Sequence, residues 1–398
     1  KAQALLNRPG DANVSPLAVY RRAAKADSVQ QRRPNVVLIM MESMSAKFMK
    51  HFGQSETLTP FLDSLYTRSI SFRNFYSAGI HTNHGLYATL YSFPAMMKRN
   101  LMKGSVIPRY SGLPTVLKEN GYYNLFFMTH EGQYDNMNAF FRTNGYDEVF
   151  SQEDYPADKV VNSFGVQDDF LYDYAIPVLN QRAATGQPFF ATLLSISNHP
   201  PYVIPPFFHP KTSEPEMQIV EYADWALRQF FEEARKQPWF DNTIFVLEGD
   251  HGKLVGDAEC ELPESYNHIP LMIYSNRIQP EEKTAFGGQV DIQPTILGLL
   301  NIDYLQNNFG VDLLKEERPC MFYTADNMVV GRNDTLLYLY NYETQQELTY
   351  DIGNGKLNAV PMDDSFLPLK EYSFSMLQSA EFLVKHGKTL NSIPFTQQ

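Results

Sequence analysis

Five polar positions in this sequence carry side chains suited to catalysis, and each follows a run of apolar or alternating residues. They are Glu42, Thr82, His130, His199 and the pair Asp250–His251. Glu42 and Asp250 offer hard oxygen ligands and His251 adds a nitrogen, a set that suits Mn²⁺, Mg²⁺ or Zn²⁺. An ion held there would lower the pKa of the Thr82 hydroxyl, which could then attack phosphorus or sulfur. His130 and His199 could hydrogen-bond the transferring group or move a proton to the leaving group.

Each of these residues also has a purely structural interpretation. Taken alone, Thr82 is better explained as a helix cap, because Thr is a common N-cap and nucleophilic Thr is rare. A Glu after a strand can be a cap, an Asp-His-Gly sequence can be a turn, and a lone His is usually a hydrogen-bonded scaffold residue. The functional interpretation therefore depends on whether the elements bring these positions together.

The elements that would position them alternate between strands and helices. The run 35–41 is continuously apolar, as expected for a strand buried on both faces of a parallel sheet. Further strands are predicted at 70–75, 123–128, 188–196, 243–247 and 270–274. Helices are predicted at 59–68, 113–120, 137–141, 165–179, 216–236 and 291–300. This order predicts an α/β fold with a doubly wound, mostly parallel sheet and helices on both faces, in which ligands bind outside the carboxyl ends of the strands.

The stretch 77–91 is predicted to place Thr82 at the start of a further helix. A turn containing glycine precedes Thr82, and Leu86, Thr89 and Leu90 follow at helical spacing. Free backbone N–H groups and the helix dipole at such a terminus favour an anion. We expect the backbone N–H of Asn83 to contact negative charge on a transferring group.

After about residue 308 the pattern changes to short strands joined by polar turns. Strands are predicted at 321–325, 328–330, 335–340 and 347–350, with a closing helix at 365–386. They indicate a small C-terminal antiparallel sheet. The predicted organisation is a linker or N-terminal arm at 1–33 with a short helix near 14–20, a catalytic domain at 34–308, and an α+β subdomain at 309–398.

Composition narrows the classes of function. The chain has 398 residues, a net charge of −12 and a pI near 5.3, which argues against a general nucleic-acid binder. Cys260 and Cys320 lack the spacing of a thiolate zinc site, and whether they pair is left open. No apolar run approaches the ~20 residues needed to cross a bilayer, and no signal peptide is visible. We expect a soluble polypeptide, with the alternative that a membrane region precedes it left open.

Three of these sequence features together resemble those of a known protein family. The strand 35–41 followed by Glu42, the Thr82 helix and the motif Glu248-Gly-Asp-His-Gly252 are similar to the sulfatase-like branch of the alkaline phosphatase superfamily. Over about residues 34–310 the pattern is most similar to the extracellular catalytic domain of phosphoglycerol transferases of the lipoteichoic acid synthase type. The resemblance implies Thr82 as nucleophile and one ion, Mn²⁺ or similar, on Glu42, Thr82, Asp250 and His251. It also implies that His130 and His199 contact the substrate.

The sequence differs from the motifs of several related enzyme groups, and these differences narrow the expected chemistry. Sulfatases convert a Cys or Ser in a C/S-x-P-x-R motif to formylglycine, and no such motif surrounds Thr82. Two-metal relatives carry an Asp four residues before the position of His199, where this chain has Ser195, which favours a single metal. Gram-positive synthases carry Trp and Arg shortly after the position of His130. Here Tyr134, Asp135 and Asn136 occur instead, so the headgroup is left open. Asp135, Asn136, Asn83 and His268 are candidate substrate contacts, with a structural role slightly favoured for His268.

The resemblance implies transfer of phosphoglycerol from phosphatidylglycerol through a phospho-threonine intermediate, with diacylglycerol released. It also implies a membrane-anchored parent on the extracytoplasmic face of a bacterial cytoplasmic membrane, acting on an anionic phospholipid or other phosphodiester. Two enzymatic alternatives use the same scaffold. One is a hydrolase of phosphate monoesters, phosphodiesters or sulfuric esters, and the other is a phosphoethanolamine transferase. A non-catalytic binding domain is the remaining alternative, and the intact ligand set argues against it.

Overall fold

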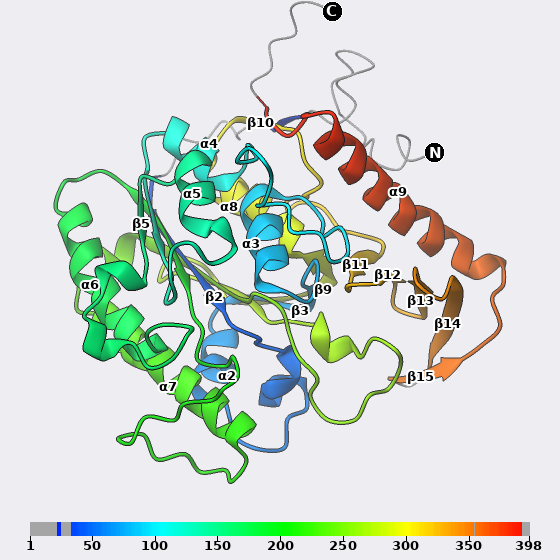
Figure 1. Ribbon diagram of the computed structural model, residues 1–398, viewed down its shortest axis with the longest axis horizontal. Helices are drawn as coiled ribbons and strands as arrows, with labels where there is room; N and C mark the ends of the chain where they lie inside the picture. The colour runs from blue at the N-terminus through cyan, green and yellow to red at the C-terminus, as the bar shows by residue number, and fades with distance from the viewer. Residues whose placement is uncertain (1–21, 25–32, 354, 392–398) are drawn as a thin grey trace, which may run out of the picture.

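The computed structural model describes residues 22–24, 33–353 and 355–391. The short helix predicted near residues 14–20 lies outside the described residues. The chain folds around one large sheet, with a second sheet and a long helix built from the C-terminal quarter (Figure 1). Among the described residues, no helix is both long enough and apolar enough to span a membrane.

Eight strands form the large sheet in the order β5-β4-β6-β2-β7-β8-β3-β9. In that order they span Glu148–Phe150, Tyr123–Phe127, Phe189–Leu194, Asn35–Met41, Thr243–Gly249, Leu271–Tyr274, Ile70–Tyr76 and Glu281–Gly288. Neighbouring strands are parallel except where β8 is involved. Because β8 is antiparallel to both β7 and β3, those two strands point the same way. The carboxyl ends of β4, β6, β2, β7 and β3 therefore share one edge.

Helices cover both faces of this sheet (Figure 1). One face carries α3 (Thr82–Tyr91), α4 (Leu113–Glu119), α5 (Met137–Thr143) and α8 (Ile292–Leu299). The other face carries α2 (Pro60–Tyr66), α6 (Asp168–Ala183) and α7 (Pro215–Ala234). Successive residues of β2 alternate between the two cores, so its continuous apolar run serves both faces.

The C-terminal region forms a five-stranded antiparallel sheet closed by one helix. Its strands in order are β11 (Met321–Thr324), β12 (Met328–Arg332), β13 (Leu336–Asn341), β14 (Gln346–Gly353) and β15 (Lys356–Ala359). Helix α9 (Leu367–Lys385) packs on β11 and β12. Arg318 joins this region to the main body through a buried fork of hydrogen bonds to Asp291, at 2.6 to 3.0 Å.

The predicted fold class is confirmed, and the differences from the predicted elements lie at the margins. The prediction omitted β5, β9, β15 and β10 (Tyr304–Gln306), each of which is an edge strand of its sheet. Strand β9 begins with the polar residues Glu-Glu-Lys-Thr, so it lacks the apolar signal of a buried strand. Residues 22–24, assigned to the arm, form strand β1 (Arg22–Ala24), which pairs with β10 (Tyr304–Gln306). The boundary near residue 308 stays a prediction.

Candidate active site

Strands β2 and β7 are neighbours in the sheet, and the residues that follow them form a cluster of three ligand-type side chains. One ligand atom each from Glu42, Asp250 and His251 lies within 4.8 Å of the other two. His251 Nε2 is 3.8 Å from Glu42 Oε1 and 3.7 Å from Asp250 Oδ2. The structure thus brings together residues that are more than 200 positions apart in the sequence, as the topology predicted.

The two carboxylates in this cluster are buried and face each other. Glu42 is 2% exposed and Asp250 is completely buried. Burial raises the pKa of Glu42 well above its usual value, and the nearby charge of Asp250 raises it further. Asp250 Oδ2 is buried and has no hydrogen-bond partner among the described residues. A divalent cation bound between these oxygens would satisfy Asp250 and remove the repulsion, so the donor set fits a metal site.

Three histidines of the site share one arrangement. In His130, His199 and His251 the Nδ1 atom faces the backbone carbonyl of the following residue, at 3.2, 2.6 and 2.7 Å respectively. Because a carbonyl oxygen only accepts hydrogen bonds, Nδ1 carries the proton and Nε2 is left with its lone pair. His251 Nε2 is therefore in the form required of a metal ligand.

Thr82 lies at the end of the turn that follows β3, and it is the first residue of α3. Its Oγ1 donates to Glu42 Oε2 at 3.4 Å. The N-cap of α3 is His81, and no side chain caps the helix. The structural interpretation of Thr82 as a cap is therefore wrong for this helix. The hydroxyl faces the carboxylate cluster and lies beside the free N–H groups of the helix terminus.

Two residues allow helix α3 to pack against the end of β7: Gln289 through its hydrogen bonds and Gly85 through its lack of a side chain. The side chain of Gln289 accepts from Ala78 N and donates to Gly249 O and Asp250 O, at 2.9, 3.1 and 2.8 Å. A Cβ at Gly85 would lie 2.2 Å from Asp250 O, closer than any real contact. Glycine is therefore required for α3 to approach the backbone of Asp250. Sequence reasoning missed both residues, because the need for them arises only in the folded chain.

His130 and His199 form part of an aromatic wall on one side of the cluster. The ring of Tyr134 lies 4.6 Å from that of His130, and Phe164 lies 3.9 Å from His199. Phe164 and Tyr134 contact each other at 6.4 Å between ring centroids. Burial lowers the pKa of His130, so its imidazole is neutral near pH 7. His130 follows β4 and His199 follows the neighbouring strand β6, so each lies after a strand, as predicted.

The candidate substrate residues Asn83, Asp135 and Asn136 lie on the α3 side of the wall. Asn83 Nδ2 donates to Asp135 Oδ2 at 3.3 Å, and Lys103 pairs with Asp135 Oδ1 at 2.7 Å. Asp135 and Asn136 have positive φ angles of 49° and 62°, in the left-handed region that Asn and Asp tolerate better than most residues. The Oδ1 atom of Asn83 is buried without a partner among the described residues.

His268 is the one candidate that the structure places in the scaffold. Its Nε2 lies 2.8 Å from the carbonyl of Arg73, and its ring stacks on Tyr76 at 5.1 Å. Its ring also meets Phe52 edge to face at 5.2 Å. Because its Nε2 is bonded to a main-chain carbonyl and its ring packs against Tyr76 and Phe52, the structure favours the structural role of His268. We withdraw it as a candidate substrate contact.

Lys253, two residues after His251, is a part of the site that the sequence analysis did not single out. Its Nζ donates to Asn198 Oδ1 at 2.7 Å and to the hydroxyl of Tyr202 at 3.0 Å. The amide of Asn198 in turn donates to the carbonyls of Glu42 and Ser43. Burial lowers the pKa of Lys253 to about 8. Its place directly after the Asp-His-Gly motif was the signal that could have found it.

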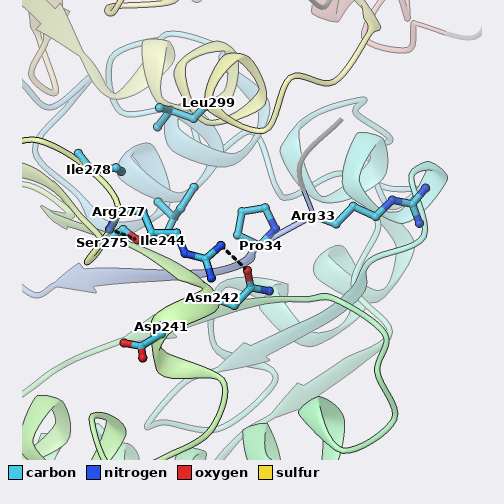
Figure 2. A pocket seen from close by; sticks show the side chains of 9 residues that line it. All are labelled: Arg33, Pro34, Asp241, Asn242, Ile244, Ser275, Arg277, Ile278 and Leu299. Atoms are coloured by element: carbon cyan, nitrogen blue, oxygen red, sulfur yellow. Dashed lines mark hydrogen bonds between the residues drawn. The ribbon is translucent and has the colours of Figure 1, made fainter. Parts of the chain in front are cut away.

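A cavity of about 470 Å³ lies at the opposite edge of the sheet (Figure 2). It is lined by Pro34 before β2 and Asn242 before β7, at the amino ends of those strands. Arg277 bonds to Asn242 across it at 3.3 Å, whereas Arg33 points away from Arg277 (Figure 2). This cavity holds none of the predicted site residues and takes no part in the chemistry considered below.

The family model for sulfatases matches residues 34–302, about two thirds of the chain. The chain belongs to the sulfatase family. It is therefore an enzyme of the alkaline phosphatase superfamily, whose members are metal-dependent phosphotransferases and hydrolases. The resemblance to the sulfatase-like branch of the alkaline phosphatase superfamily is therefore confirmed.

Curated relatives point to the same branch. Lipoteichoic acid synthases 2 and 1 of Bacillus subtilis are 24% and 25% identical over 71% and 81% of the chain. Phosphoglycerol transferase I of Xanthomonas campestris is 25% identical over 76% of it. The chain spans 47%, 53% and 46% of these proteins respectively, so it corresponds to about half the length of each.

Solved structures share the fold over nearly the whole chain. A protein of the alkaline phosphatase superfamily from Vibrio parahaemolyticus has a TM-score of 0.86 and 26% identity, covering 98% of this chain and 95% of that one. The lipoteichoic acid synthase LtaP from Listeria monocytogenes has a TM-score of 0.76 and 21% identity, covering 92% and 94%. Both matches extend past residue 308, so the C-terminal sheet belongs to the shared architecture.

Proposed function

We propose that this chain is the catalytic part of a phosphoglycerol transferase that uses Thr82 as a nucleophile on a phosphodiester. The observation that carries the proposal is the position of the Thr82 hydroxyl. It lies at the start of a helix and bonds to Glu42, which belongs to the same cluster as the buried oxygen of Asp250 that lacks a hydrogen-bond partner among the described residues. Relatives named as lipoteichoic acid synthases and a phosphoglycerol transferase support this choice of reaction.

Glu42, Thr82, Asp250 and His251 would hold one divalent ion, for which we propose Mn²⁺, with Mg²⁺ or Zn²⁺ as alternatives. When bound, the ion lowers the pKa of the hydroxyl and offsets negative charge on the substrate. Ser43 helps to set the ligands in place. Its backbone N–H donates to Asp250 Oδ1 at 2.8 Å and its hydroxyl donates to Glu42 Oε1 at 2.7 Å. Ser43 has a φ of 50°, a conformation that non-glycine residues rarely adopt.

The proposed chemistry has two displacement steps. In the first, Thr82 Oγ forms a bond to phosphorus, the bond from phosphorus to the lipid oxygen breaks, and diacylglycerol leaves with a proton. In the second, an acceptor hydroxyl loses its proton and attacks phosphorus, and Thr82 Oγ departs. The N–H groups at the start of α3, including that of Asn83, are placed to stabilise charge on the phosphoryl oxygens.

His130 and His199 are proposed to handle the protons of both steps. Because Nδ1 of each ring is committed to a carbonyl, Nε2 is the atom available to the substrate. A neutral Nε2 can accept the proton of the acceptor hydroxyl, and the protonated ring can return it to a leaving oxygen. Asp135 and Asn136 are proposed to contact the headgroup beside Asn83.

The proposal extends to the setting of the whole protein. The donor would be phosphatidylglycerol or another anionic phospholipid in the outer leaflet of a bacterial cytoplasmic membrane. The parent protein would be anchored by a region that precedes residue 1, with this chain on the extracytoplasmic side. No nucleic-acid partner is proposed, because the net charge of −12 opposes binding to a polyanion.

Product analysis tests the transferase proposal against a hydrolase on the same scaffold. The chain is incubated with Mn²⁺ and phosphatidylglycerol, with and without glycerol or a glycolipid as acceptor. We expect diacylglycerol together with a glycerophosphoryl acceptor product whose yield rises with acceptor concentration. If free glycerophosphate is the only second product at every acceptor concentration, the transferase proposal is wrong and the hydrolase replaces it. Phosphatidylethanolamine as a better donor would reassign the headgroup.

A further inference from the structure

Between Asp63 and Glu119 the chain contains no acidic residue, although it has 45 Asp and Glu in total and a net charge of −12. The Lys and Arg residues in that interval are Arg68, Arg73, Lys98, Arg99, Lys103, Arg109 and Lys118. Four of them, Lys98, Arg99, Lys103 and Arg109, lie in the connection between α3 and α4, and the first three lie within nine residues. We call residues 98–106 the basic loop. It concentrates positive charge on a protein that is otherwise acidic.

Hydrogen bonds place the basic loop beside the active site. Lys103 pairs with Asp135 at 2.7 Å, and Asp135 accepts from Asn83, the residue after Thr82. The carbonyl of Arg99 accepts from the hydroxyl of Tyr87 on α3 at 3.5 Å. The chain therefore turns back along α3 after the helix ends, toward the end of the helix that carries Thr82 (Figure 1).

The basic loop also carries the most exposed large apolar side chain among the described residues. Val106 is 81% exposed. Two more exposed apolar side chains, Tyr134 and Val161, lie on loops after β4 and β5, each 44% exposed. Lys98 and Arg99 are also exposed, and no carboxylate of the described residues forms an ion pair with either. Cations without partners, next to exposed apolar groups, are the composition of a membrane-interface segment.

We propose that the basic loop docks on the surface of an anionic phospholipid bilayer and holds the Thr82 end of α3 at the level of the headgroups. This proposal rests on the proposed function only in that the bilayer would contain the donor. The apolar side chain of Val106 favours a bilayer over a soluble polyanion, because an apolar group gains nothing from binding to a charged polymer in water. Each Lys or Arg near an anionic leaflet strengthens binding by roughly fivefold.

Vesicle binding tests the docking surface without any turnover. The full chain is titrated with vesicles of phosphatidylglycerol and phosphatidylcholine in equal parts, and with vesicles of phosphatidylcholine alone. The test variant is the double substitution Lys98→Gln and Arg99→Gln. The matched control is Lys356→Gln with Lys385→Gln, two exposed cations on β15 and α9. Lys103 is left unchanged because it pairs with the candidate substrate contact Asp135.

We expect the full chain to bind the anionic vesicles and not the neutral ones. The test variant should bind about 30-fold more weakly and the control unchanged. Val106→Ser should weaken vesicle binding while leaving binding to soluble polyphosphate unchanged. Equal losses in test variant and control, or a Val106→Ser variant that binds as tightly as the native chain, would overturn the proposal. Stronger binding to polyphosphate than to vesicles would assign the loop to a soluble polyanion instead.

Failure of the docking proposal is distinguishable from failure of the proposed function. Thr82→Ala should bind vesicles as the native chain does, because the nucleophile takes no part in docking. The Lys98/Arg99 variant should turn over a soluble phosphodiester at the native rate and lose rate only on vesicles. A native chain that binds vesicles but releases no product would reject the proposed reaction and leave the docking surface intact.

Discussion

Asp250 is the residue on which the metal proposal depends most, because one of its oxygens is buried without a partner among the described residues. Without metal, Asp250 and Glu42 are two buried acids that face each other, and the pKa of Glu42 is raised by its burial and further by the nearby charge of Asp250. A buried charge without compensation destabilises the folded state. If the proposed ion binds, we therefore expect the cluster to reduce the stability of the metal-free protein and to increase that of the metal-bound protein.

We predict that Asp250→Asn has opposite effects in the two states. Without metal, the variant should unfold at the same temperature as the native chain or higher, because a buried charge is removed. With saturating Mn²⁺, the native melting temperature should rise by several degrees and that of the variant should not. Thermal unfolding with and without chelator measures both. Asp241→Asn, at the other edge of the sheet, should respond to Mn²⁺ as the native chain does; an equal Mn²⁺ response in Asp250→Asn would refute the ligand assignment.

His84 predicts a dependence of stability on pH. Its side chain is 1% exposed, and burial lowers its pKa to about 3 from 6.5. The unfolded chain therefore binds a proton below pH 6.5 that the folded chain does not, so stability falls as the pH drops from 6.5 toward 3. Between pH 7 and 5 this residue alone should cost about 2 kcal/mol of unfolding free energy.

Urea unfolding of the His84→Gln variant at pH 7 and pH 5 checks this value. The native chain should lose about 2 kcal/mol more than the variant over that interval. His209→Gln serves as the control, because His209 is exposed and should leave the native pH dependence intact. If His84→Gln and the native chain lose the same free energy between the two pH values, the buried histidine is not the source.

At the scale of elements, helix α3 packs unusually close to the end of β7. The substitution Gly85→Ala tests this close packing, because it should raise the melting temperature if there is free space and lower it if there is none. In a helix with free space, Ala is more favourable than Gly by about 1 kcal/mol. Here the added Cβ would lie 2.2 Å from Asp250 O, so the helix must move. We predict a lower melting temperature and at least tenfold weaker Mn²⁺ binding.

Gly298→Ala on α8 is the matched control for this substitution. Its Cβ would meet only the carboxylate end of Asp312, which is a side chain that can move. We expect Mn²⁺ affinity in this control to equal that of the native chain, measured by calorimetry. Unchanged affinity in Gly85→Ala as well would show that α3 tolerates a displacement and does not set the metal site.

The apolar periodicity of the sequence was enough to predict the core elements and the edge at which the site lies. The run 35–41 and the strand at 243–247 carry the signal of buried strands, so Glu42 and Asp250 could be expected at one edge. The order β6-β2-β7 was not visible in the sequence, because neighbours in the sheet lie far apart along the chain. The polar edge strand β9 gave no apolar signal either.

The sequence did not predict the residues that position the site by hydrogen bonds to other parts of the chain. Gln289 has no spacing that identifies it, and Lys253 is marked only by its place directly after the Asp-His-Gly motif. Their roles depend on distances across the fold, such as that between Lys253 and Asn198. For His268, the place before a strand suggested the pocket, although a structural role was slightly favoured. In the structure its ring stacks on Tyr76 and its Nε2 bonds to the carbonyl of Arg73, which agrees with the structural role.

At the scale of the whole molecule, the C-terminal sheet supports the turn that delivers Thr82. Thr324 N donates to Ala78 O at 3.0 Å, and Asp326 pairs with His81 at 2.6 Å. Tyr323 stacks on Tyr76 of β3 at 5.4 Å. We propose that the predicted boundary near residue 308 separates two structural regions that fold together and not alone.

A chain ending at residue 308 should therefore fail to fold. It would lose Arg318, leaving the buried Asp291 without its cation, and would expose Tyr76 to solvent. We expect no cooperative thermal transition and no Mn²⁺ binding in the truncated chain, measured by circular dichroism and calorimetry against the full chain. A truncated protein that melts cooperatively and binds Mn²⁺ with native affinity would contradict this interpretation.

The central claim is that Thr82 becomes covalently bonded to phosphorus during turnover. Intact-mass and peptide mass spectrometry of the chain, quenched in acid during reaction with phosphatidylglycerol and Mn²⁺ in the absence of acceptor, measures this directly. We predict a glycerophosphoryl group on Thr82, and neither adduct nor turnover in Thr82→Ala. Turnover at the native rate by Thr82→Ala, or an adduct on a different residue of the native chain, would contradict the account.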